Sequence, residues 1–187
     1  MREQAFKIDE KFTYQDYLHL PDNGKRYQVI NGEIYMVPAP APYHQRILAR
    51  VFKIVDSFVA HENLGAVFIS PCDVILSDTD IVQPDLFFIG QDRLDIIKER
   101  NIQGAPDLVV EVLSPHSEKI DKISKTKLYA RFGVKEYWIV SPDNKEVTVL
   151  RLRGESYRNQ GNFGIQNSFK SPLLKGLTVK VSEIFQP

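Results

Sequence analysis

The chain is short of cysteine, of long apolar runs and of any excess of charge, and each shortage excludes a class of protein. Cys72 is the only cysteine, so a disulfide framework or a thiolate zinc cluster within one chain is excluded. No apolar run approaches the roughly 20 residues that a membrane span requires. Residues 1–7 lack the apolar stretch of a signal peptide. We therefore expect a cytoplasmic protein that does not enter a membrane.

Charge is balanced over the whole chain but not along it. Lys and Arg together number 24, and so do Asp and Glu, which excludes a global attraction to polyanions. A protein of this composition that acts on nucleic acid must concentrate its positive charge locally. One such cluster lies between residues 119 and 131, although lysine-rich surface helices are commonly only solvated. Its members are Lys119, Lys122, Lys125, Lys127 and Arg131.

The length and the order of the expected elements predict one domain over residues 1–187 with a mixed sheet. The Asn31-Gly32 pair between two alternating runs predicts a hairpin, and helical spacing of apolar residues predicts a helix over 43–62. Apolar runs predict strands over 81–89 and 107–113, and a helix is expected over 117–132. Helices interspersed among strands predict an α/β or α+β fold with a mixed central sheet flanked by helices.

Two acids stand in these apolar strands and are the first candidates for a site. Asp85 precedes the run 86–89, and Glu111 lies inside the run 108–113. An ionised carboxylate in a buried strand is costly unless it is paired or binds a metal. Asp107 shares a strand face with Glu111 but lies about 13 Å away along the strand, too far to bind the same ion. Asp85 can instead lie level with Glu111 on a neighbouring strand, so we assign Asp85 and Glu111 to the site.

Two interpretations of this pair of acids remain open. In one, both are strand-end residues paired with lysines. In the other, they bind a divalent metal for phosphodiester chemistry, since carboxylate oxygens suit hard cations.

The helix expected over 117–132 favours the second interpretation. At about 100° per residue, Asp121 and Lys125 fall within the same arc of about 60° as two apolar residues, Leu128 and Phe132. That stripe is expected to face the sheet, which would bring the Lys125 ammonium near Glu111. Lys125 could then hold a phosphate or stabilise charge that develops in a transition state. Tyr129 extends the same edge and would either bond a phosphate oxygen or pack.

Three further residues are supporting candidates. Glu33 follows the predicted turn and is either a third metal ligand or a charge at the hairpin end. His44 opens the long helix after a proline-rich loop and, as a lone histidine, is more often an ordinary helix-start residue than a catalyst. Gln83 lies two residues before Asp85 on the predicted strand and could contact the site.

Taken in order, these residues resemble a known family. The segments that carry the resemblance are residues 27–33, His44 and residues 82–85, 106–115 and 121–138. They are similar to the putative restriction endonuclease (Uma-type) family of the PD-(D/E)XK nuclease superfamily, over about residues 12–185.

The resemblance implies a restriction-endonuclease-like core and a site that holds Mg²⁺ or Mn²⁺. By position, Asp85 is the first acid of the superfamily motif and Glu111 the second. The motif's lysine should stand two residues after the second acid, where this chain has Leu113. In the family the lysine is displaced to the following helix, which here means Lys125. Glu33 and His44 match family positions, and a nucleic acid, with DNA the expected one, is the substrate that the resemblance implies.

The expected function is therefore that of a metal-dependent endonuclease that hydrolyses phosphodiester bonds in DNA. A first alternative is a catalytically inactive nucleic-acid-binding or assembly module, which Leu113 and the zero net charge favour. A second is hydrolysis of another phosphoester by the same acids. A homodimer is a further expectation, because nuclease domains of this size often act in pairs.

Overall fold

A six-stranded mixed sheet forms the centre of the computed structural model, which describes residues 11–21, 24–114 and 120–186, except the side chains of residues 120 and 121. Its strand order is β11-β10-β9-β8-β6-β3, and only β8 and β9 run parallel. These strands are β3 (Gly65–Ile69), β6 (Leu86–Gly90), β8 (Leu108–Val112), β9 (Glu136–Ser141), β10 (Glu146–Arg153) and β11 (Ser156–Gly164).

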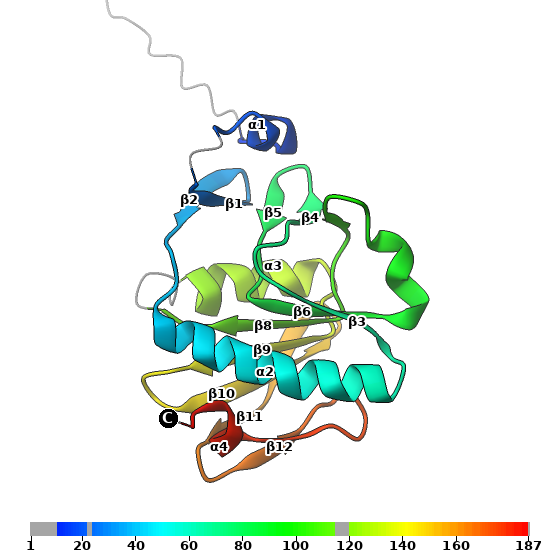
Figure 1. The fold of residues 1–187 in the computed structure, drawn as a ribbon. Helices are drawn as coiled ribbons and strands as arrows, with labels where there is room; N and C mark the ends of the chain where they lie inside the picture. Colours follow the sequence, from blue (N-terminus) through cyan, green and yellow to red (C-terminus); the bar gives the residue numbers. More distant parts are fainter. Residues whose placement is uncertain (1–10, 22–23, 115–119, 187) are drawn as a thin grey trace, which may run out of the picture.

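A second sheet of five shorter strands stands beside the first, at the top of Figure 1. Its order is β2-β1-β5-β4-β7, and a separate pair, β12 and β13, lies near the other end of the molecule. The strands are β1 (Arg26–Ile30), β2 (Glu33–Val37), β4 (Val74–Ser77), β5 (Asp80–Val82), β7 (Ile102–Gln103), β12 (Ser168–Lys170) and β13 (Thr178–Lys180).

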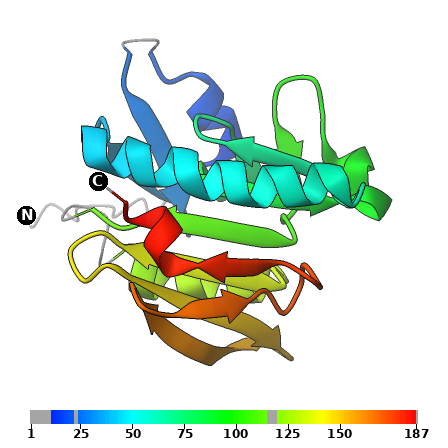
Figure 2. The same ribbon diagram turned by 60° about the horizontal axis from the view of Figure 1, so that its bottom comes forward.

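Helices cover both faces of the six-stranded sheet, with α2 in front and α3 behind (Figure 1). Figure 2 shows the length of α2 and the short α4 beside its first half. The helical segments are α1 (Tyr14–Leu18), α2 (Pro42–His61), the 3₁₀ segment η1 (Gln91–Ile96), the π-helical turn η2 (Ile120–Lys125), α3 (Thr126–Arg131) and α4 (Val181–Ile184). In the described ranges, no helix has both the length and the apolar character needed to cross a membrane. The predicted mixed sheet flanked by helices is confirmed.

Strand alternation divides the core into two apolar clusters, one on each face of the central sheet. Leu108 and Val110 of β8 pack with α2 and α4, whereas Val109 packs with α3 and the five-stranded sheet. Glu111 has the same parity as Val109, so its side chain belongs to the α3 face. The sequence pattern of β8 thereby determines which helix can supply partners to Glu111.

The hairpin and the long helix form where the sequence predicts them. Asn31 and Gly32 both have positive φ, 55° and 81°, as a two-residue turn between strands with right-handed twist requires. The buried residues of α2 follow helical spacing and close one face of the sheet: Ile47, Leu48, Val51, Val55 and Val59.

The single strand predicted over residues 81–89 is wrong, because the structure divides it between the two sheets. β5 belongs to the five-stranded sheet and β6 to the six-stranded sheet, and residues 83–85 connect them. Pro84 has no amide hydrogen and cannot donate to a sheet ladder, so pairing stops there. Asp85 consequently lies at the point where the chain enters the central sheet.

Asp107 provides a test of what holds the start of β8. Its carboxylate, 2% exposed, accepts a hydrogen bond from the Gly90 amide and pairs with Arg93 and Lys135. Burial alone would raise the pKa of Asp107, but Lys135, the Gly90 amide and Arg93 together hold this pKa below its ordinary value.

We expect Asp107→Asn to lower the free energy of unfolding by about 1–3 kcal/mol at pH 7, since both cations keep access to water. The folded-state pKa is depressed, so this stabilisation is present above the unfolded pKa of about 4 and is lost as the pH falls through the folded value. Urea denaturation at pH 7 and pH 3 measures the difference. The exposed turn residue Asp143, changed to Asn, is the control, and an equal loss at both pH values would contradict the assignment.

Candidate active site

Asp85, the residue before β6, lies beside Glu111 of β8 at one end of the central sheet. Leu86 of β6 is opposite Val110 of β8 in antiparallel register, so the next pair outward is Asp85 and Glu111. The Val112 amide donates a hydrogen bond of 2.8 Å to Asp85 Oδ2. Extending this register brings the two acids level, although Asp85 lies in the connection before β6 and not in a strand. Their assignment to one site stays a prediction.

Glu111 is a buried acid held by two partners from the helix behind the sheet. Lys125 Nζ lies 2.8 Å from Glu111 Oε1, and the Tyr129 hydroxyl donates a 2.7 Å hydrogen bond to the same oxygen. The side chains of Lys125 and Glu111 are only 5% and 3% exposed. Little water screens an ion pair this deep, and removing one partner would leave the other charge buried and uncompensated.

Lys125 faces inward for the reason that the sequence indicates, although the local helix differs from the expected one. Residues 120–125 form a π-helical turn and α3 begins only at Thr126, so a spacing of 100° per residue does not hold before that point. Leu128, 2% exposed, packs into the apolar cluster on this face of the sheet. This packing orients α3 and carries Lys125 toward Glu111.

His44, at the start of α2, contacts Asp85 from the face of the central sheet opposite to α3. Its Nε2 lies 3.2 Å from Asp85 Oδ2 and 2.9 Å from the Val112 carbonyl oxygen. Both neighbours are acceptors here, so Nε2 carries the proton and donates. Burial lowers the pKa of His44, but the hydrogen bond and charge of Asp85 outweigh it and the net pKa is raised.

A cavity of about 370 Å³ opens over these residues. Two lysine or arginine side chains reach its wall, Lys125 and Arg26. Arg26 donates one hydrogen bond of 3.2 Å to the Pro38 carbonyl. Apart from these cations the wall is formed by the loop after β2, by ends of strands and by polar side chains: Gln28, Val37, Pro38, Ala39, Pro40, Ala41, His44, Gln83, Asp85, Glu111, Val112 and Ser114.

Gln83 lies in the wall of the cavity, with its amide nitrogen bound elsewhere. The nitrogen donates to Asp73 Oδ1 at 2.7 Å and to the Tyr17 hydroxyl at 3.3 Å. Its amide oxygen is buried and has no hydrogen-bond partner among the described residues.

The remaining predicted residues are placed differently. Tyr129 reaches Glu111, whereas Glu33 is exposed at the hairpin, accepts a 2.6 Å bond from Tyr35 and does not line the cavity. The side chain of Asp121 lies outside the described part of the chain, as does Lys119. The rest of the basic cluster is not a single patch, because Lys125 is paired with Glu111 and Arg131 with Asp80.

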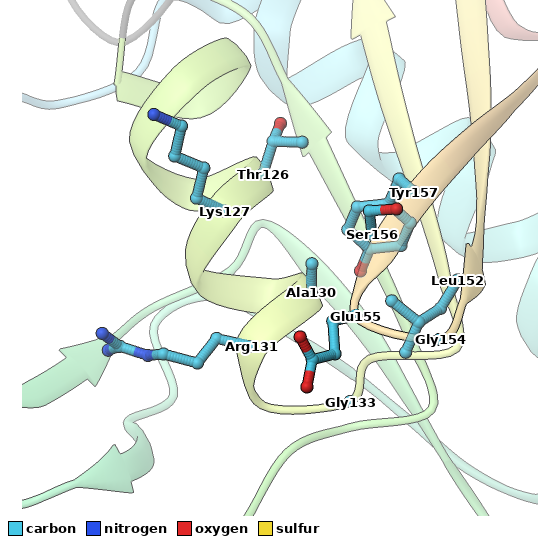
Figure 3. Close-up of a pocket in the computed structure, with 10 residues that line it drawn as sticks. All are labelled: Thr126, Lys127, Ala130, Arg131, Gly133, Leu152, Gly154, Glu155, Ser156 and Tyr157. Carbon is cyan, nitrogen blue, oxygen red and sulfur yellow. The ribbon is translucent and has the colours of Figure 1, made fainter.

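A larger cavity, of about 610 Å³, lies on another part of the surface and lacks the chemistry of a metal site. Figure 3 shows it between α3 and the hairpin of β10 and β11, with Thr126 and Ala130 on one side and Ser156 and Tyr157 on the other. Glu155 is the single acid in its wall. The smaller cavity, with two carboxylates, is therefore the candidate active site.

A family comparison matches most of the chain. Residues 14–182 match the model of the family Uma2, described as "Putative restriction endonuclease". The chain belongs to the Uma2 family. The match includes every element from α1 to the start of α4, and hence both acids, His44 and Lys125. A comparison with curated proteins gave no match.

A solved structure shares the fold. The crystal structure of a putative nuclease belonging to DUF820 from Anabaena variabilis ATCC 29413 superposes with a TM-score of 0.79 at 20% identity. The alignment covers 93% of this Uma2 chain and 97% of the other chain. At this identity the likeness shows the fold.

Sequence reasoning did not find two of the cavity residues, Arg26 and Gln28. Both lie on β1 and share a strand face, because they are two residues apart. A usable signal was present in the sequence, since Gln28 is a polar residue directly before Val29 and Ile30 in the predicted strand. The structure buries it, with 6% of its surface exposed. What the linear sequence does not show is that this hairpin comes to lie over residues 80 positions away.

The buried ion pair of Lys125 and Glu111 predicts a non-additive effect on stability. Lys125→Met leaves a buried carboxylate without its cation, so we expect a loss of about 3 kcal/mol in the free energy of unfolding. The double variant Lys125→Met/Glu111→Gln should recover most of that loss, because no buried charge remains.

Chemical denaturation of both variants and of Glu111→Gln alone measures this coupling. The exposed pair of Lys180 and Glu183, 3.7 Å apart, is the matched control, and Lys180→Met should cost below about 0.5 kcal/mol. Additive losses in the double variant would show that the two charges do not depend on each other.

Proposed function

We propose that this Uma2 protein is a metal-dependent endonuclease that hydrolyses phosphodiester bonds in DNA. The observation that carries the proposal is the convergence of Asp85, Glu111 and Lys125 in one cavity, with Lys125 Nζ 2.8 Å from Glu111. The match to a family described as putative restriction endonucleases and the fold shared with a putative nuclease support it.

The donor set fits a hard divalent cation such as Mg²⁺ or Mn²⁺. Asp85 and Glu111 would hold the ion, because ionised carboxylates are its preferred protein ligands. Amide oxygens without hydrogen-bond partners belong to the same cavity wall. Within the described ranges no group of three or more His, Cys, Asp or Glu side chains forms a metal cluster, so two carboxylates would be the charged ligands. When bound, the ion supplies Lewis acidity to the phosphate and acidity to a coordinated water.

The residues of the chain have distinct tasks in this reaction. The Val112 amide and His44 hold Asp85 Oδ2, while Tyr129 and Lys125 hold Glu111. Lys125 is the buried cation nearest the two acids and would stabilise negative charge that develops on the phosphate. Asp121 and Glu33 remain predicted supporting residues.

Arg26 would bind the phosphate backbone of the substrate at the same cavity. Its planar guanidinium makes a single hydrogen bond within the described residues, to Pro38. Free N–H groups of such a fork suit a phosphodiester, which offers two oxygens at matching spacing. This supplies positive charge at the site despite the zero net charge of the chain.

The alternative is a binding or assembly module that has the fold without the reaction. Leu113 occupies the usual lysine position and packs into the core, 6% exposed. The contact of Lys125 with Glu111 favours the enzyme. Lys125, from the helical segment that follows β8, supplies beside the second acid the ammonium group that Leu113 lacks. We also propose that residues 1–187 act as one nuclease domain in the cytoplasm, as a homodimer.

Nicking of supercoiled plasmid with Mg²⁺ or Mn²⁺ tests the proposal. We expect Asp85→Asn and Lys125→Ala to lower the rate by about 100-fold or more, because each removes a charge that acts on the phosphate. Asp143→Asn, an exposed acid outside the cavity, is the control. Circular dichroism establishes that the variants are folded.

Two results would contradict the assignment. Full metal-dependent cleavage by Asp85→Asn would remove Asp85 from the reaction. Salt-dependent binding of DNA by the wild type, with no cleavage of plasmid, single strands or RNA in either metal, would favour the binding module.

A separate measurement addresses Arg26. Arg26→Ala should weaken DNA binding severalfold and reduce by about one the slope of log affinity against log salt, as expected for one lost phosphate contact. Arg158 on β11 is exposed and does not line the cavity, so Arg158→Ala should leave affinity within about twofold. Equal effects of the two variants would show only a general loss of charge.

A further inference from the structure

Buried polar atoms without partners are concentrated in one place. The described residues contain four such side-chain atoms, and three belong to the wall of the candidate active site: Gln28 Oε1, Gln83 Oε1 and His44 Nδ1. Buried acceptors in native proteins are nearly always bonded, because leaving one unpaired costs as much as losing a hydrogen bond. Three in one cavity indicate that the cavity is built for a ligand that supplies the missing partners.

The orientation of Gln83 is determined by its neighbours. Asp73 Oδ1 accepts from the Gln83 nitrogen at 2.7 Å and from the Tyr17 hydroxyl at 2.8 Å. Burial, and then the charge of Asp73, raise the pKa of Tyr17, so its phenol stays a donor. Turning the amide over would set its oxygen against the Asp73 carboxylate. The Gln83 oxygen is therefore held where no group of the described residues donates to it.

Gln28 comes to the same cavity from the neighbouring strand. Val29 of β1 is opposite Ile81 of β5, so Gln28 is opposite Val82 and next to Gln83. Gln28 of β1 and Gln83, in the connection after β5, thus line the same cavity as Asp85 and Glu111. The cavity lies where the five-stranded sheet meets the end of the six-stranded one.

The type of these atoms identifies the ligand. Amide oxygens and ionised carboxylates only accept hydrogen bonds. A phosphodiester also only accepts, so it cannot satisfy them. A hydrated divalent cation has the opposite character, because its water molecules donate and its charge suits the two acids.

We propose that Gln28 and Gln83 are positioning residues of the cation site, whose amide oxygens bind the hydrated divalent cation that Asp85 and Glu111 hold by charge. This inference rests on the proposed metal-dependent function. It adds two neutral residues, Gln28 and Gln83, to the two acids that would hold the ion. On this proposal the five-stranded sheet has a role at the cation site, because Gln28 lies on its strand β1. Neutral ligands of this kind tune affinity for the ion and keep its hydration geometry in place.

Calorimetric titration with Mn²⁺, without any substrate, tests the proposal. We expect Gln28→Leu and Gln83→Leu each to weaken Mn²⁺ binding by about tenfold, and Gln28→Glu, which keeps an oxygen, to bind at least as tightly as wild type. Gln45→Leu, at an exposed position of α2, should bind as wild type does. Asp85→Asn should abolish binding.

The melting temperature of Gln28→Leu distinguishes a role in cation binding from a role in holding the fold together. Gln28→Leu removes an unpartnered acceptor, so the metal-free melting temperature should stay the same or rise while the increase caused by Mn²⁺ shrinks. A large fall in the metal-free melting temperature would instead show that Gln28 supports the fold.

The outcomes separate this inference from the function on which it rests. If both leucine variants bind Mn²⁺ like wild type while Asp85→Asn does not, the role of the glutamines is refuted and the metal-dependent function stands. If the wild type itself binds neither Mn²⁺ nor Mg²⁺, both are refuted.

Discussion

The burial of Glu111 is the constraint on which the site depends. This acid lies in a central strand covered on both faces, where an ionised carboxylate is stable only with close partners. Lys125 and Tyr129 provide them from the helix behind the sheet. The position of α3 is therefore determined by charge as well as by apolar packing, and any shift of the helix would leave a buried charge unpaired.

The break between β5 and β6 has a comparable effect on Asp85. Because Pro84 ends pairing, the chain passes from one sheet to the other within three residues, and Asp85 arrives at the edge of β8. There the Val112 amide and His44 hold its carboxylate. The site thus receives side chains from both sheets and from the helices on both faces of the central one, and no single element could provide it.

Features set by neighbouring residues could be predicted. The turn at Asn31 and Gly32 follows from their tolerance of positive φ, and α2 follows from its apolar spacing. The inward direction of Lys125 was predicted from its alignment with Leu128, although the π-helical turn before it was not. The split of residues 81–89 was missed because apolar residues lie on both sides of Gln83, Pro84 and Asp85, although Pro84 is a local signal that ends pairing there.

The sequence by itself determined a mixed sheet flanked by helices and indicated that Asp85, Glu111 and Lys125 lie close together, because apolar period and residue type are local properties. Only the tertiary structure decided that His44 bonds Asp85, that Glu33 stays outside the cavity and that Gln28 lines it. The physical reason is that strand register and the packing of one sheet over the other bring together side chains separated by up to 100 residues. Partners at such distances leave no periodic trace in the sequence.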